Sequence, residues 1–330
     1  MIGFLLSFFL GLFPMLVFAW VIYWLDRYEK EPLLLIGGVF VWGAIGAATA
    51  AFFINTIFGL GVYLFTSSET ATNLATGSLI APVVEEVMKG LAVLSVFLLA
   101  RNEFDSFMDG IVYAGIVALG FAATENVYYI YSHGFLEGSY GALLWVAFVR
   151  ICLVGWQHPF YSAFFGIGLA ISRMYRSPAA RILAPLGGLG IAILFHSLHN
   201  TIGSLIHGVG GLVAEAAFDW SGWSLMFLFI LWATARERGW IVKHLCEEVD
   251  LGLISCAQYE TACSAWSQVI ARFNALLNGR YRATSRFYQI CGELAQKKHQ
   301  RQTLGEESSN SQIIKRLQLE LGSLAHFALA

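Results

Sequence analysis

The stretch IGFLLSFFLGLFPMLVFAWVIYWL, from Ile2 to Leu25, contains no charged side chain. The hydrocarbon core of a bilayer is about 30 Å thick, and an α-helix needs roughly 20 apolar residues to cross it. The stretch therefore predicts a membrane-spanning helix. It lacks the basic residues that precede the apolar core of a cleaved signal peptide, so we expect the helix to be retained.

The composition extends this interpretation to most of the chain. Of the 330 residues, 57% are hydrophobic and 13% are charged, and the mean hydropathy is +0.64. A soluble domain carries about 25% charged residues. Twelve of the twenty Lys and Arg residues follow Ala235, so the charge deficit lies before it. We expect an all-α polytopic membrane protein, with a transmembrane domain over 1–235 and a helical cytoplasmic tail over 236–330. The net charge of −2 gives no indication of a nucleic-acid partner.

Apolar runs of sufficient length predict about seven transmembrane helices. They cover approximately 2–25, 33–58, 78–100, 109–131, 158–175, 181–205 and 221–235. The segment 139–157 is also apolar but contains Arg150, and joined to the next span it would be too long for one crossing. Pro159 favours a helix start there. We therefore expect 139–157 to be an interfacial or re-entrant helix. The tail predicts short amphipathic helices with a break around 305–310.

The positions of Lys and Arg predict the orientation, because cytoplasmic loops are enriched in these residues. The connections around 26–32, 101–108 and 174–181 are basic, whereas 59–77, 132–139 and 206–220 contain neither Lys nor Arg. This alternation predicts a cell-membrane protein whose N-terminus is outside and whose tail is cytoplasmic.

Ionisable side chains inside membrane spans are costly, so each one is a functional hypothesis. Counted from the cytoplasmic end of each span at 1.5 Å per residue, four of them lie roughly 22–24 Å deep, on four different helices. A shared depth favours one common site over separate packing roles. The four residues are Glu86, Glu125, His158 and His196.

Local spacings suggest roles within such a site. Glu85 and Lys89 are four residues apart in the order that favours an ion pair on one helix. Glu86 would then lack that partner, which makes it the expected general base, with Glu85 as the alternative if Lys89 pairs with Glu86 instead. His196 and Asn200 share a helix face, and Asn126 and Asn200 are neutral donors of the kind that stabilise an oxyanion. His199 is either functional or structural on this pattern, and Arg150 suggests a lipid headgroup contact.

Several motifs resemble the PrsW family of intramembrane peptidases, between about residues 10 and 205. They are Asp26–Pro32, Glu85-Glu86-Val87-Met88-Lys89, Asp109–Tyr113, Gly120–Asn126, His158 with Phe164, Phe165 and Gly166, and His196 with Asn200. In this order the motifs are specific, although each alone would be weak. The family resembles a larger group that includes type II CAAX prenyl proteases and bacterial immunity-type membrane proteases. Members of that group are usually discussed as glutamate-dependent, although the label metalloprotease is also used.

The resemblance implies cleavage of a membrane-anchored protein substrate, with anti-sigma factors as the known theme. Together with the spacings it predicts a peptidase in which a glutamate activates water. The expected catalytic residues are Glu85, Glu86, His158 and His196, supported by Lys89, Glu125, Asn126 and Asn200. The partners would be the substrate and the lipid bilayer.

Three alternatives remain open at this point, and one of them is a non-catalytic scaffold that captures membrane segments. Glu86, His158 and His196 could instead hold a zinc ion with one position left for water, although the sequence contains no His-Glu-x-x-His element and we expect no cofactor. The same polar residues could also form the proton relay of a transporter or channel. A relay would be distributed across the membrane, whereas these residues share one depth.

Overall fold

The structure, a computed structural model, describes residues 1–306 and 309–328 and contains only helices over these ranges. The chain divides into two compact units. Unit 1 comprises residues 1–24, 31–173 and 177–228, and unit 2 comprises residues 25–30, 174–176 and 229–330. This division falls inside one helix, Gly208–Asp250, and the expected domain boundary at residue 235 stays a prediction.

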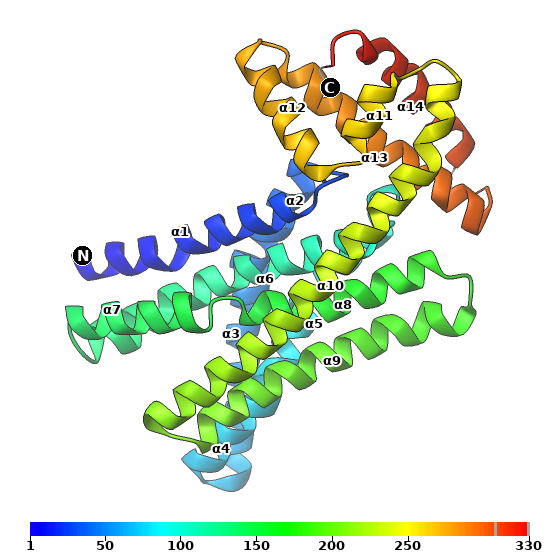
Figure 1. Ribbon diagram of the computed structural model, residues 1–330. Helices are drawn as coiled ribbons and strands as arrows, with labels where there is room; N and C mark the ends of the chain where they lie inside the picture. The colour runs from blue at the N-terminus through cyan, green and yellow to red at the C-terminus, as the bar shows by residue number, and fades with distance from the viewer. Residues whose placement is uncertain (307–308, 329–330) are drawn as a thin grey trace. The chain divides into compact units, whose positions relative to one another are not determined.

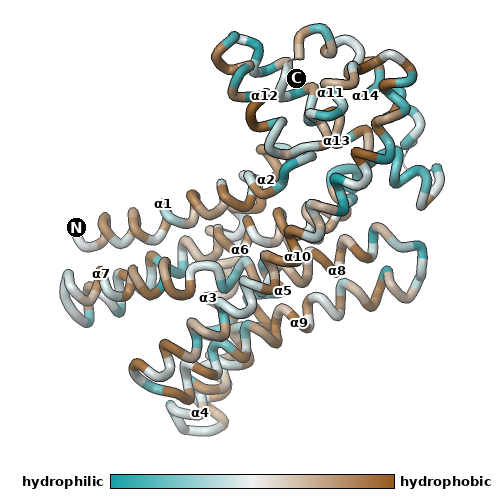
Figure 2. The backbone as a smooth tube through the Cα atoms, in the orientation of Figure 1, coloured by the Kyte–Doolittle hydropathy of each residue, from teal (hydrophilic) through white to brown (hydrophobic). Residues whose placement is uncertain are grey.

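Unit 1 is a bundle of long apolar helices (Figures 1 and 2). Its elements are α1 (Ile2–Leu25), α2 (Leu33–Val41), η1 (Trp42–Ala47), α3 (Ala48–Thr66), α4 (Glu69–Ala75), η2 (Thr76–Ile80), α5 (Ala81–Leu99), η3 (Arg101–Glu103), α6 (Phe107–Tyr129), η4 (Ile130–Leu136), α7 (Tyr140–Phe148), η5 (Val149–Leu153), α8 (Gln157–Met174), α9 (Pro178–Leu205) and the first half of α10 (Gly208–Asp250).

Six helical stretches of the described residues are long and apolar enough to cross a membrane, which makes the chain a multi-pass membrane protein. They are Ile2–Leu25, Leu33–Thr66, Phe107–Leu136, Tyr140–Met174, Pro178–Leu205 and Gly208–Asp250. The expected span at 78–100 is helical but is not among the six, because Glu85, Glu86 and Lys89 interrupt its apolar run.

Two of the expected boundaries differ from the observed helices. The segment 139–157 forms α7 and η5, and a short non-helical break at Val154–Trp156 separates them from α8, which begins one residue before His158. In Figure 1 α8 continues in the general direction of α7. The last expected span, 221–235, lies inside the longer α10, because no proline interrupts the chain between Gly208 and Asp250. An interfacial or re-entrant role for 139–157 stays a prediction.

The stretch Phe107–Leu136, which comprises α6 and η4, is the most buried of the six, with 94% of the residues in its most apolar segment inside the protein. Glycines allow its neighbours to approach it at backbone distance. A Cβ atom added at Gly110 would lie 2.3 Å from the carbonyl oxygen of Gly166 in α8, and one added at Gly166 would lie 1.9 Å from that of Gly110. Gly120 meets the backbone of Phe40 in the same way. These contacts fix α6 against α8 and α2.

The Asp109–Tyr113 motif shapes the start of α6. Ser106 and Asp109 form a capping box, in which the side chain of each residue accepts a hydrogen bond from the backbone N–H of the other. One turn later the Tyr113 hydroxyl donates to the buried carboxylate of Glu31. Caps of this kind satisfy backbone donors that the first helical turn leaves free.

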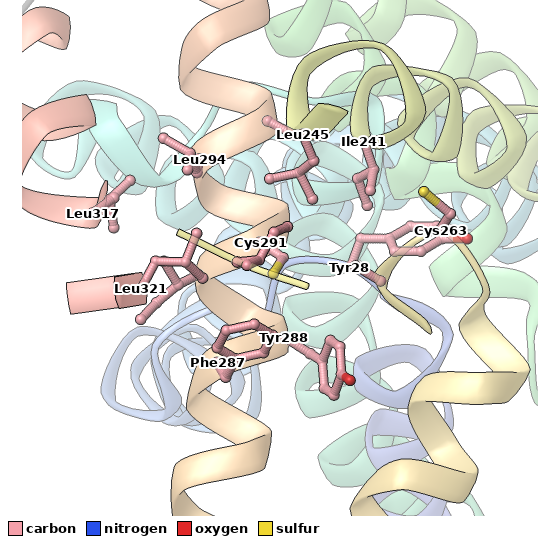
Figure 3. Packing of buried hydrophobic residues seen from close by; sticks show 14 of the residues in the cluster. Tyr28, Ile241, Leu245, Cys263, Phe287, Tyr288, Cys291, Leu294, Leu317 and Leu321 are labelled. Carbon is pink, nitrogen blue, oxygen red and sulfur yellow. The ribbon is translucent and has the colours of Figure 1, made fainter. Parts of the chain in front are cut away.

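Unit 2 contains the tail, and in its described residues four further helices follow α10. They are α11 (Cys256–Ala262), α12 (Ala265–Leu277), α13 (Tyr281–Leu304) and α14 (Asn310–Ala325). They pack with Ile241, Leu245 and the loop residue Tyr28 around the buried face of α13, which includes Cys291 and Leu294 (Figure 3). The expected break at 305–310 falls between α13 and α14, and its residues 307–308 lie outside the described ranges.

Candidate active site

The four expected catalytic residues meet inside unit 1. Glu85 and Glu86 come from the middle of α5, His158 from the first turn of α8 and His196 from α9. All four are buried, with exposed fractions of 2–7%. The imidazole rings of His158 and His196 lie 5.1 Å apart between centroids and are nearly perpendicular. Hydropathy, shared depth and the motif spacings had indicated these residues in the sequence, because a polar side chain in an apolar helix needs polar neighbours.

Glu86 is the most connected carboxylate of the site. Lys89 donates to its Oε1 at 2.5 Å, Ser162 of α8 donates to its Oε2 at 2.7 Å, and Nδ1 of His196 lies 2.9 Å from Oε1. The expected ion pair between Glu85 and Lys89 is therefore wrong. The rotation of α5 turns Glu86 toward α8 and α9, and a spacing of three residues brings Lys89 to it as readily as a spacing of four would bring Lys89 to Glu85.

Glu85 has few polar contacts among the described residues. Its Oε1 accepts a long hydrogen bond of 3.5 Å from Asn55 of α3. Its Oε2 is buried without a hydrogen-bond partner and lies 3.7 Å from Nε2 of His196. A buried carboxylate oxygen with no donor is costly. Such an oxygen is therefore well placed to accept a proton from a water molecule.

Each histidine is held by a carboxylate through one ring nitrogen. Nε2 of His158 lies 2.8 Å from Oε2 of Glu125, and its Nδ1 lies 3.3 Å from Nζ of Lys89. Because an ammonium group can only donate, Nδ1 of His158 accepts and Nε2 carries the proton toward Glu125. By the same reasoning His196 donates from Nδ1 to Glu86, which leaves its Nε2 as a free acceptor facing Glu85.

Glu125 is held in turn by Arg150 of η5. The guanidinium donates to Glu125 through Nη2 and, through Nε, to Oδ1 of Asn126 at 2.8 Å. Our expectation of a headgroup contact for Arg150 is therefore wrong, since its side chain is only 14% exposed. The guanidinium of Arg150 thus binds both Glu125 and Asn126, the two supporting residues expected on α6. Nδ2 of Asn126 remains a buried donor without a hydrogen-bond partner in the described structure.

Asn200 contacts a different element. Its Nδ2 donates to the carbonyl oxygen of Gly77 in η2 at 2.8 Å, so the amide connects α9 to the turn that precedes α5. Asn55 and Ser162 were not predicted from the sequence. Ser162 could have been found, because it lies one helical turn after His158 and on the same face.

Three ligand-type atoms of this site converge. Glu85, His158 and His196 each offer one donor atom, and these atoms lie within 4.8 Å of one another. The set contains Glu85 in place of Glu86, the residue expected for a metal ion. One carboxylate and two imidazoles are a known zinc-binding combination, and a carboxylate behind each imidazole is a typical second contact. The residue types therefore fit a divalent metal ion.

Comparison with known proteins gives the family of the chain. The model of the PrsW family of intramembrane metalloproteases matches residues 31–234, more than half of the chain. "Protease PrsW" of Bacillus subtilis (strain 168) is 25% identical over 227 residues, which cover 67% of this chain and 88% of the relative. "Protease PrsW" of Geobacillus kaustophilus (strain HTA426) is 32% identical over 124 residues, which cover 38% of this chain and 52% of the relative. No solved structure matches. The chain belongs to the PrsW family of intramembrane proteases.

Proposed function

We propose that this chain is an intramembrane endopeptidase that cleaves membrane-anchored protein substrates through a water molecule activated by Glu85. The observation that carries the proposal is the convergence of Glu85, His158 and His196 from three helices in a buried cluster. The Protease PrsW relatives support the reaction class. A proton relay would need polar groups along the membrane normal, and the transporter alternative is not favoured.

In the proposed reaction, a water molecule lies between Oε2 of Glu85 and Nε2 of His196. Glu85 takes one proton from this water, and the oxygen attacks the carbonyl carbon of the scissile peptide bond. The buried ammonium of Lys89 stabilises the negative charge that develops on the carbonyl oxygen. Glu85 then transfers its proton to the departing amide nitrogen as the C–N bond breaks. Glu86 and Glu125 hold His196 and His158 in fixed orientations throughout.

The experiment that tests this function is co-expression with tagged single-span substrates. We expect the wild type to release a shorter tagged fragment, and His158→Ala and His196→Ala to release none at equal expression. Anti-sigma-factor-like segments are the first substrates to test, following the family resemblance. A fragment that persists unchanged in both variants would contradict the assignment of the site.

Metal dependence is the main alternative form of the same reaction. A divalent ion would be held by Glu85, His158 and His196, where it would lower the pKa of a bound water. We favour the form without a metal ion, because Nζ of Lys89 is fully buried 3.3 Å from Nδ1 of His158 and already supplies positive charge there. A metal ion bound to that nitrogen would lie close to the ammonium group of Lys89 and would be repelled by it.

Metal removal should therefore leave cleavage intact. Purified protein in detergent would be treated with a strong chelator, and the initial rate of substrate cleavage compared with that of untreated protein. We expect equal rates. A loss of activity that is restored by adding Zn²⁺ would overturn the metal-free form and assign the three residues as ligands.

The orientation of the chain is proposed from its basic loops. The N-terminus would be outside and residues 236–330 would be cytoplasmic, with the site nearer the outer surface. A reporter active only in the cytoplasm should give signal when fused after the tail and none when fused before Ile2. The reverse result at either fusion point would contradict this topology.

A further inference from the structure

A second buried polar cluster adjoins the active site. It contains Tyr161 of α8, His199 of α9 and Asp219 of α10. The Tyr161 hydroxyl donates to Oδ1 of Asp219 at 2.7 Å, and Nδ1 of His199 lies 3.1 Å from Oδ2 of Asp219. Tyr161 and Asp219 are fully buried, and His199 is 7% exposed. The carboxylate comes from a helix that contributes no residue to the contacts around Glu85 and Glu86.

A fully buried carboxylate in a membrane helix is costly unless its partners compensate for it. One oxygen of Asp219 is satisfied by the phenol. The other faces His199 at ion-pair distance without the geometry of a hydrogen bond. An apolar side chain would fill this position at a lower desolvation cost, so packing alone does not explain the carboxylate. Its hydrogen bond to Tyr161 is the better explanation.

The partner of Asp219 contacts the catalytic histidine. The Tyr161 ring lies 5.2 Å from the ring of His196 between centroids and only 25° from parallel, and it meets His158 edge-on at 6.3 Å. His196 is thus held at Nδ1 by Glu86 and along its face by Tyr161. The tyrosine is fixed at one end by the α8 backbone and at the other by Asp219.

We propose that Asp219 is a positioning residue that acts through Tyr161 to fix the plane of the His196 ring, so that Nε2 keeps facing Glu85. The activity test of this inference rests on the proposed function, whereas its structural test does not. A displacement of about 1 Å in a catalytic group can cost about 10²-fold in rate. His199 neighbours the carboxylate and is a structural partner of it.

The activity test uses variants that separate the hydrogen bond from the charge. Asp219→Leu and Tyr161→Phe both remove the bond, and each should lower kcat roughly 10–100-fold with little change in KM. Asp219→Asn keeps an acceptor for the phenol and should retain most of the wild-type kcat. The double variant should lose no more than the worse single variant, because both act through one contact. Ser221→Ala, on the exposed side of α10, is the matched control.

The structural test uses the nitrogen NMR signals of His196, assigned by their loss in His196→Gln. In the wild type we expect a single tautomer protonated at Nδ1, and in Asp219→Leu and Tyr161→Phe a mixture of tautomers or a broadened signal. Wild-type kcat together with an unchanged His196 signal in Asp219→Leu would overturn the proposal, as would additive losses in the double variant. If the wild type cleaves no substrate, the peptidase function fails, while the NMR comparison still decides the role of Asp219.

Discussion

Replacing Glu85 with Gln should abolish detectable cleavage without destabilising the protein. Glutamine keeps the size of the side chain but cannot accept the proton of the attacking water, and a positioned general base contributes roughly 10²–10⁴-fold to a rate. Oε2 of Glu85 has no hydrogen-bond partner among the described residues, so its replacement removes an uncompensated buried charge. The initial cleavage rate in detergent and the thermal midpoint of the same preparation are the two measurements.

Glu85→Asp provides the matched control for this variant. Aspartate keeps a carboxylate but shortens the side chain by one methylene, so we expect a partial loss of rate that lies between those of the wild type and Glu85→Gln. Undiminished cleavage by Glu85→Gln would show that Glu85 is not the base and would return that role to Glu86.

Breaking the ion pair between Glu86 and Lys89 should have the largest effect on stability. Lys89 is fully buried and Glu86 is 2% exposed. Removing one partner of a buried ion pair costs about 3–5 kcal/mol, because the remaining charge is left uncompensated, whereas replacing both with apolar groups is often neutral. We expect Glu86→Gln and Lys89→Met each to unfold at a markedly lower temperature than the wild type.

The double variant Glu86→Gln/Lys89→Met completes the cycle and should recover part of the lost stability, because it leaves neither charge without its partner. Its unfolding temperature, measured in the same detergent, separates the pair's own contribution from the loss of packing. Two single effects that simply add in the double variant would contradict the ion pair. A wild-type unfolding temperature for Lys89→Met would do so as well.

The sequence predicted which polar side chains the structure brings together but not how they pair. Acidic and imidazole side chains are rare in apolar helices, so hydropathy and depth were enough to place Glu86, Glu125, His158 and His196 together. Choosing between Glu85 and Glu86 as the partner of Lys89 required the rotation of α5 about its axis. That rotation is set by contacts such as Ser162 and His196 with Glu86, which come from distant parts of the sequence.

Arg150 and Asn200 illustrate the same limit. An arginine near the end of an apolar segment is compatible with a headgroup contact and with a buried ion pair, and only the position of Glu125 on α6 decides between them. Asn200 shares a face with His196 on an ideal helix, yet its amide reaches the carbonyl oxygen of Gly77. Periodicity gives the face of a helix, whereas hydrogen-bond partners depend on which helix is packed against that face.

The direct backbone contact between Gly110 and Gly166 limits where this protein can change shape. No side chain separates the two helices there, and a Cβ atom on either glycine would clash with the backbone of the other. Because close-packed backbones leave no room between the helices, we expect α6 and α8 to move together. Glu125 and His158 belong to those two helices, and we expect their separation of 2.8 Å to change little when other helices move. We therefore expect a substrate segment to enter the protein between helices other than these two.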